Sequence, residues 1–243
     1  MLLASLEGPM RIELFGDGHG AVELVDSMGS DLSVVNAARV SFGAEKKEVD
    51  DRDIKLINYL AAHNHTSPFE HCAITFKFTV PLFIRSQHHR HRTWSYNEIS
   101  RRYTSVDMKF YSPKQYRTQH KSNRQASNNE LINPVVDSYN LNLTLSAPAD
   151  SMVDIHHKNS INLFESLLRA GICREQARGV LPQNLYTEYY GTVNLHNLLK
   201  FVSLRVHSGA QWEIQQVAKA CLKIARETFP HSIEAFEKHR GDL

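Results

Sequence analysis

The segment CAITFKFTVPL, from Cys72 to Leu82, decides the fold. Its apolar side chains occupy every second position, at Cys72, Ile74, Phe76, Phe78, Val80 and Leu82. This alternation predicts a β-strand with one buried face and one partly polar face. An arginine-rich segment begins just past its end, at Arg85. Because rigid strands often deliver site residues onto the loop or helix that follows, we expect functional residues there.

The sequence before this strand indicates a hairpin and two helices. RIELF at 11–15 and AVELVD at 21–26 read as short strands joined by GDGHG. The glycines permit a tight turn, but their spacing and the strand that follows them exclude a dinucleotide-binding fingerprint. We predict helices over 31–40 and 51–62, each opening with an aspartate suited to capping free amides.

The sequence after the arginine-rich segment is polar at first and then helical. Residues 112–149 lack a sustained apolar pattern, and we expect a mobile polar excursion there. Helical spacing returns between Met152 and Gly171, in a short helix around Arg174, and from Ile214 to Ala225. Early strands and late helices favour an α+β fold: a single domain over 1–243, with an early antiparallel sheet and a mostly helical C-terminal half. Residues 1–9 are expected to form a flexible extension.

Composition narrows the class of protein. The chain has 243 residues with 42% hydrophobic and 22% charged, which is typical of a globular domain large enough to fold without disulfides or a structural metal. Three cysteines without C-x-x-C spacing exclude a disulfide framework and favour a cytoplasmic setting. We find no export signal and no apolar run long enough to span a membrane.

Positive charge is concentrated in one segment. The chain carries a net charge of +2, whereas Arg85–Tyr103 holds five arginines against one glutamate. Three hypotheses compete for this segment: a solvated basic surface, a nucleic-acid-binding groove, and a compact pocket for a small phosphorylated aromatic ligand. A nucleic-acid groove should spread its charge, so the pocket explains the pattern best. Gln87, Glu98 and Ser100 would complete the hydrogen bonding around the ligand.

This segment resembles the flavin-dependent thymidylate synthases. RHRTWSYNEIS, from Arg90 to Ser100, has the form R-H-R followed by seven residues and Ser, which is their signature. Further stretches are similar to the same family: ELVDSMGSDLSVVNAARVSF at 23–42, HTSPFEH at 65–71, REQARGVLPQNLYTEYYGTVN at 174–194 and LRVHSGAQWEIQQ at 204–216.

The resemblance implies an enzyme that methylates dUMP to dTMP. It implies FAD as the redox carrier, methylenetetrahydrofolate as carbon donor and NADPH as reductant, in a homotetramer with shared active sites. The residues implied to contact the nucleotide are Gln87, His88, His89, Arg90, Glu98, Ile99, Ser100, Arg101, Arg102, Arg178 and Arg205. Those implied on the flavin side are Ser41, His65, Ser67, Glu70, Arg90, His91, Arg92, Glu98, Asn194 and His196. The alternative hypothesis is a non-enzymatic basic protein that binds nucleotide or nucleic acid.

The methylation that the resemblance implies requires one catalytic cation. Methylation requires C5 of uracil to become nucleophilic, and a cation beside O2 and N3 would stabilise the negative charge that develops on the ring. We assign this role to Arg205. The cysteines show no signature of activation, and we interpret Cys72, Cys173 and Cys221 as structural. Histidines near His65 have loose spacing for a metal site, and we predict none.

Overall fold

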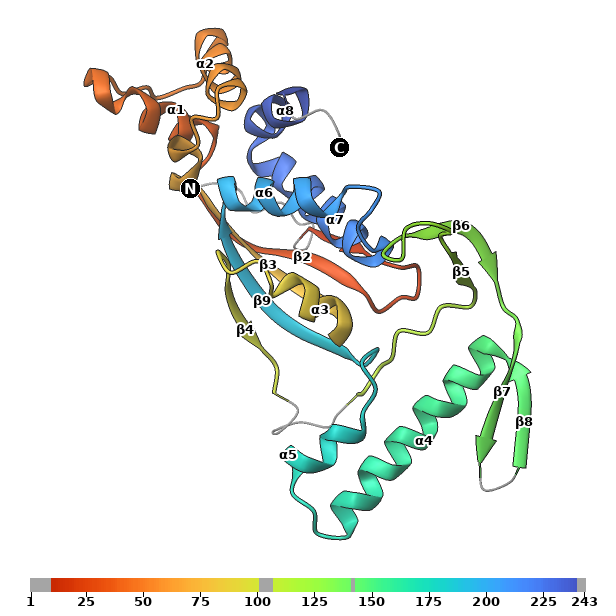
Figure 1. The fold of residues 1–243 in the computed structure, drawn as a ribbon. Helices are drawn as coiled ribbons and strands as arrows, with labels where there is room; N and C mark the ends of the chain where they lie inside the picture. Colours follow the sequence, from red (N-terminus) through yellow and green to blue (C-terminus); the bar gives the residue numbers. More distant parts are fainter. Residues whose placement is uncertain (1–9, 101–106, 141–142, 240–243) are drawn as a thin grey trace.

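The computed structural model describes residues 10–100, 107–140 and 143–239 (Figure 1). Its central layer is an antiparallel sheet with the strand order β1-β2-β3-β9-β4. These strands are β1 (Arg11–Glu13), β2 (Ala21–Met28), β3 (Ala73–Pro81), β4 (Ser95–Glu98) and β9 (Tyr186–Asn194). The fold is therefore a mixture of an antiparallel sheet and helices, and the early hairpin β1–β2 confirms the prediction from the glycine turn.

The decisive strand forms as β3. Its alternate side chains Ile74, Phe76, Phe78 and Val80 are almost completely buried, whereas Thr75, Lys77 and Thr79 on the other face are partly exposed. Helices α6 (Leu195–Arg205) and α7 (Trp212–Thr228) lie over the apolar face in Figure 1 and complete the core. The helical spacing from Ile214 to Ala225 is confirmed, since that stripe of α7 is buried.

The sheet departs from the prediction in one respect. Its inner strand β9 comes from the C-terminal half, where helices were expected, and pairs along its full length with β3. Gly191 lets β9 pack closely against two aromatic rings. A Cβ at this position would meet Phe78 at 2.9 Å and Trp94 at 3.2 Å. Close approach of two rings therefore requires glycine at this position.

Three helices form a layer beside the sheet. They are α1 (Asp31–Arg39), α2 (Asp51–Ala62) and α8 (Pro230–His239). Asp50 caps α2 by accepting from the amides of Arg52 and Asp53. The expectation that Asp31 and Asp51 cap the helices they open is wrong, because Ser30 is the N-cap of α1 and Asp50 is that of α2. The Asp31 carboxylate instead accepts from the first amides of α8, at His231 (2.8 Å) and Ser232 (3.0 Å).

The expected mobile excursion is largely ordered as β-structure. It contains two separate hairpins, made by β5 (Tyr116–Gln119), β6 (Ser127–Ile132), β7 (Val135–Asn140) and β8 (Leu143–Pro148). Short polar strands of this kind lack the buried alternation by which β3 is recognised in the sequence. In Figure 1 the hairpin β7–β8 lies beside the long helix α4 (Ala149–Arg169), which leads to α5 (Arg174–Ala177).

The arginine-rich segment follows the end of β3, as expected. Pro81 ends the strand, and helix α3 (Leu82–His88) starts at the next residue. The chain then turns back into the edge strand β4 beside β9. No helix within the described residues is long and apolar enough to cross a membrane.

Candidate active site

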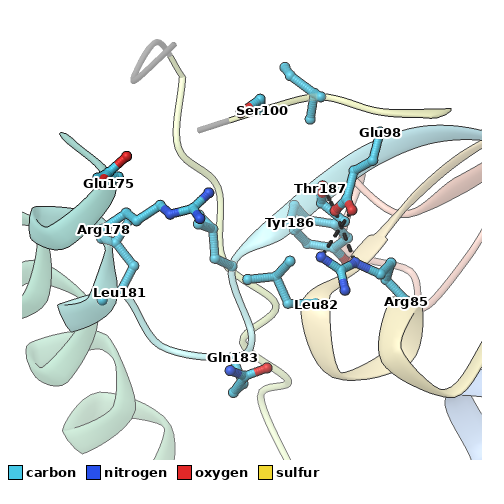
Figure 2. A pocket seen from close by; sticks show the side chains of 13 residues that line it. Leu82, Arg85, Glu98, Ser100, Glu175, Arg178, Leu181, Gln183, Tyr186 and Thr187 are labelled. Carbon is cyan, nitrogen blue, oxygen red and sulfur yellow. Dashed lines mark hydrogen bonds and ion pairs between the residues drawn. The ribbon is translucent and has the colours of Figure 1, made fainter. Parts of the chain in front are cut away.

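A cavity of about 600 Å³ lies between the end of the sheet and the segment after α4. We call it the first cavity. One wall comes from α5 and the 3₁₀ turn Arg178–Val180, and the other from α3, β4 and β9 (Figure 2). It is lined by Leu82, Arg85, Glu98, Ile99, Ser100, Glu175, Arg178, Gly179, Leu181, Gln183, Leu185, Tyr186 and Thr187. The structure thus brings four predicted nucleotide residues, Glu98, Ile99, Ser100 and Arg178, into one cavity.

Charge is distributed unevenly across the first cavity. On the sheet side, Arg85 and Glu98 form a bidentate ion pair with nitrogen–oxygen distances of 3.0 and 2.9 Å, and the Thr187 hydroxyl donates to Glu98 at 2.7 Å. On the opposite wall, the exposed Arg178 side chain projects toward the space in Figure 2. No acidic side chain among the described residues forms an ion pair with Arg178. The cavity therefore offers Arg178 as a cation for an anionic ligand.

Arg85 is a lining residue that the sequence analysis did not assign. Its charge was counted in the basic segment, but no motif singled it out. Gln183, just before β9, and Tyr186 and Thr187 at its start were also missed, although they fall within the stretch 174–194 that resembles the family. Arg101 and Arg102 lie outside the described residues.

His88, which is predicted to contact the substrate, has its ring in the core. The ring is completely buried, and Nδ1 lies 2.8 Å from the Tyr189 hydroxyl. It packs edge-on against Phe78 and Trp94. Burial holds the pKa of His88 well below its ordinary value, and the neighbouring His91, His89 and Arg205 also oppose its protonation, so the ring is neutral. Such a ring stabilises packing and cannot reach a ligand.

A second group of predicted residues gathers around the C-terminal end of α6. Arg205 Nε donates to His91 Nε2 at 3.0 Å, which joins a predicted nucleotide residue to a predicted flavin residue. Because arginine only donates, His91 must accept and is neutral. Burial, together with the charges of Arg205 and Lys200, lowers the pKa of His91 to about 4.

The remaining arginine-segment predictions lie near this group but outside the first cavity. Gln87 Nε2 donates to Gln211 Oε1, and the His89 ring stacks on Tyr96 with centroids 4.0 Å apart. Arg90 and Arg92 are exposed. Gln87, His89, Arg90, Arg92 and Arg205 are absent from the lining of the first cavity. One chain therefore presents the predicted nucleotide residues as two separate sets.

A second cavity of about 290 Å³ has one predicted flavin residue, His196, in its lining. It is lined by Leu60, Ala61, Asn64, Thr66, Phe69, His196, Leu199, Lys200, Ser232 and Phe236. His65, Ser67 and Glu70 lie on the same exposed loop and turn as Thr66, so they border this cavity, whereas Ser41 is exposed beside α1. Asn194 accepts from the Asn197 amide and caps α6. Hydroxyl, imidazole and ammonium groups around a part-apolar space suit one portion of a flavin nucleotide.

The three cysteines differ in burial. Burial raises the pKa of the Cys72 thiol to about 11, and burial also raises the pKa of Cys221 well above its ordinary value. Both thiols are therefore poor nucleophiles, whereas Cys173 is exposed at the start of α5. The described residues contain no cluster of His, Cys, Asp or Glu that could hold a metal ion. His71 ends a 3₁₀ turn, and the strand that was expected from Cys72 begins at Ala73.

Comparison with known proteins decides the family. A family model described as thymidylate synthase complementing protein matches residues 23–231. A flavin-dependent thymidylate synthase from Thermotoga neapolitana is 44% identical over 226 residues, covering 92% of this chain and 94% of the relative. The chain belongs to the flavin-dependent thymidylate synthases. This membership confirms the enzyme hypothesis over that of a non-enzymatic basic protein.

Two further comparisons cover nearly the whole length of this chain. A flavin-dependent thymidylate synthase from Thermus thermophilus is 42% identical, covering 96% of this chain and 81% of that protein. A crystal structure of PolB from Streptomyces cacaoi, a UMP/dUMP methylase bound with 5-Br dUMP, is 33% identical with a TM-score of 0.76. It covers 96% of this chain and 100% of the PolB chain. The similarity therefore includes both cavities and both sets of predicted nucleotide residues.

Proposed function

We propose that this flavin-dependent thymidylate synthase binds the phosphate end of dUMP in the first cavity, with Arg178 and Ser100 as its principal contacts. The protein is a methyltransferase that converts dUMP to dTMP. The observation that supports our placement is the convergence of Glu98, Ile99, Ser100 and Arg178 from β4 and the turn after α5 on one cavity. Arg178 has no ion pair with a described residue, and a phosphate dianion is the ligand that such a cation binds best.

Glu98 has a different role in this arrangement. Its carboxylate is held by Arg85 and Thr187, so it is fixed in direction before a ligand enters. A fixed carboxylate can accept from a ribose hydroxyl without first losing side-chain freedom. We therefore assign Glu98 to sugar recognition and Arg85 to positioning Glu98.

The electron balance of the reaction defines the other reactants. Transfer of a methylene carbon from methylenetetrahydrofolate to C5 displaces the C5 proton, and a hydride must then reduce the methylene to methyl. Bound FAD would supply this hydride, and NADPH would restore the reduced flavin. The products are dTMP, tetrahydrofolate and NADP⁺. Arg205 provides the positive charge that stabilises the electron-rich ring when C5 attacks.

The flavin is proposed to lie across the second cavity and the neighbouring surface. His65, Ser67, Glu70, Asn194 and His196 would supply its polar contacts, while Lys200 offers a cation to the diphosphate. With a volume of about 290 Å³, the second cavity would hold only part of the FAD. Ser41, Arg90, His91, Arg92 and Glu98 would contact the rest.

We infer that complete active sites require a homotetramer. In one chain, Arg178 lies in the first cavity and Arg205 in a separate set with His91. A neighbouring copy could bring its own Gln87, Arg90 and Arg205 against the first cavity. Exposed apolar side chains at Val40 (73%) and Phe42 (85%) support contact between copies, because covering them with another copy would remove apolar surface from water. We place the enzyme in the cytoplasm, where its thiols would stay reduced.

The experiment supplies the purified protein with C5-tritiated dUMP, methylenetetrahydrofolate and NADPH. We expect a yellow protein that releases tritium and forms dTMP. A colourless protein that FAD cannot reconstitute, or one that binds FAD without releasing tritium, would contradict the proposal. UMP should be tested in parallel because PolB is a UMP/dUMP methylase. The higher identity to the thymidylate synthases predicts a larger kcat/KM for dUMP.

A further inference from the structure

A chain of polar side chains connects Gln87 with the polar segment 112–149. Gln87 Nε2 donates to Gln211 Oε1, and Gln211 Nε2 donates in turn to Glu213 Oε2 at 2.9 Å. The other carboxylate oxygen of Glu213 accepts from Arg117 Nη2 at 2.5 Å and from the Tyr111 hydroxyl at 3.0 Å. The chain thus runs from α3, through the start of α7, to β5.

Glu213 is buried, so its carboxylate depends on the side chains that pair with it. The Glu213 side chain is only 5% exposed and that of Arg117 is 22% exposed. The Arg117 guanidinium also lies over the Trp212 ring, 4.8 Å from its centroid, which fixes its direction. A buried carboxylate needs a paired cation and saturated hydrogen bonding. Arg117, Tyr111 and Gln211 together meet this need.

The Glu213 carboxylate determines how the side-chain amides of Gln211 and Gln87 are oriented. An ionised carboxylate only accepts hydrogen bonds, so Gln211 must turn its amino group toward Glu213. Its carbonyl oxygen then faces Gln87, which must present its own amino group in response. Consequently Gln87 Oε1 and the second Nε2 hydrogen remain for another partner, in one defined orientation.

We propose that Glu213 and Arg117 are positioning residues that orient the Gln87 carboxamide for nucleotide binding. The inference rests on the proposed function, in which Gln87 contacts dUMP. It gives the segment 112–149 a function, because Arg117 on β5 is the only cation among the described residues that pairs with Glu213. The polar hairpin therefore secures a site residue on a distant helix. Fixed orientation lowers the entropy lost when a nucleotide binds.

The test compares Glu213→Gln, Arg117→Met and Gln87→Ala in the intact holoenzyme. A glutamine at 213 can both donate and accept, so the amide polarity is no longer fixed. We expect each single variant to raise KM for dUMP about fivefold, as the loss of one ordinary hydrogen bond does, with kcat changed less than twofold. Arg117→Lys, which keeps the cation, should recover part of the loss.

A double-mutant cycle separates positioning from general destabilisation. In a Gln87→Ala background, Glu213→Gln should raise KM no further, because there is no carboxamide left to orient. Multiplication of the two effects would overturn the inference, as would an unchanged KM in Glu213→Gln. Arg124→Met, an exposed arginine between β5 and β6, serves as the matched control and should leave KM unchanged. Circular dichroism must show that each variant is folded, and Arg117→Lys provides a second variant if Arg117→Met is not.

The same measurements distinguish failure of this inference from failure of the proposed function. If the wild-type enzyme releases no tritium from dUMP, the proposed function fails. If it is active and Gln87→Ala raises KM for dUMP while Glu213→Gln leaves KM unchanged, only the positioning inference fails.

Discussion

Arg205 Nε donates to His91 Nε2 at 3.0 Å, and this contact fixes the direction of the guanidinium at the end of α6. The bond occupies Nε, so the two terminal nitrogens stay available to a ligand. It also requires a neutral imidazole. The catalytic role that we propose for Arg205 is therefore coupled to the protonation of His91, and each can be tested separately.

Arg205→Lys should lower turnover more than nucleotide affinity. Lysine keeps one positive charge but cannot present a planar fork while donating to His91. We expect kcat to fall about a hundredfold and KM for dUMP to rise less than fivefold, as for loss of a group that acts mainly on transition-state charge. Steady-state kinetics of tritium release measure both values. Equal losses in kcat and in affinity would contradict the ring-activation role.

His91 should titrate with a pKa near 4 instead of near its ordinary value of 6.5. The folded pKa is depressed, so between these values the unfolded chain binds more protons and stability rises with pH. The contribution of neutral His91 is complete above about pH 6.5 and is lost as pH falls through about 4. NMR titration of the imidazole, assigned with His91→Gln, gives the midpoint.

A variant checks the cause of this shift. Arg205→Met removes one of the two positive charges that disfavour protonation of His91. The NMR midpoint should then move upward toward 6.5. An unchanged midpoint would assign the whole shift to burial and Lys200.

The elements that could be predicted from sequence are those with a regular apolar period. The period of two in β3 and the helical stripe of α7 each describe one buried face, and both formed as expected. In β9, by contrast, Gly191 replaces a large side chain where Phe78 and Trp94 approach. Close packing therefore removed the local signal that would have identified this inner strand.

The site was less accessible to sequence reasoning because its contacts join distant positions. Arg85 pairs with Glu98 across a helix and an edge strand, and Gln87 meets Gln211 more than a hundred positions away. The burial of the His88 ring could not be predicted for a related reason. Its motif is polar, but its ring fills the aromatic core beside Tyr189, and only the tertiary structure distinguishes these environments.

Arg178→Met should weaken dUMP binding. Removing one charge-assisted contact to phosphate predicts a Kd about ten- to a hundredfold higher. Isothermal titration with dUMP measures the change, and Arg169→Met, on the exposed end of α4, is the control that should bind normally. A normal Kd for Arg178→Met would move the phosphate away from the first cavity.

Asp31→Ala should destabilise the enzyme without a direct effect on catalysis. The Asp31 carboxylate satisfies the amides of His231 and Ser232 at the start of α8, and its loss leaves buried donors without an acceptor. We expect a loss of about 2 kcal/mol, which corresponds to a fall in Tm of about 4–8 °C for a chain of this size. Thermal unfolding measures it. The exposed Asp26→Ala is the control, and an equal fall there would refute the capping role.

Phe42→Asp should dissociate the proposed tetramer and impair the flavin site together. Val40 and Phe42 flank Ser41, a predicted flavin contact, on one exposed 3₁₀ turn. A second copy that covers these two apolar side chains would therefore bring Ser41 of the first copy next to the flavin site of the second copy. A charge at position 42 opposes that burial. Light scattering should detect a smaller species, and flavin absorbance should fall with it. Lys121→Asp, exposed between β5 and β6, should keep both properties. A Phe42→Asp protein with unchanged mass and bound flavin would show that this turn lies outside the interface, and the shared site would then have to form through another surface.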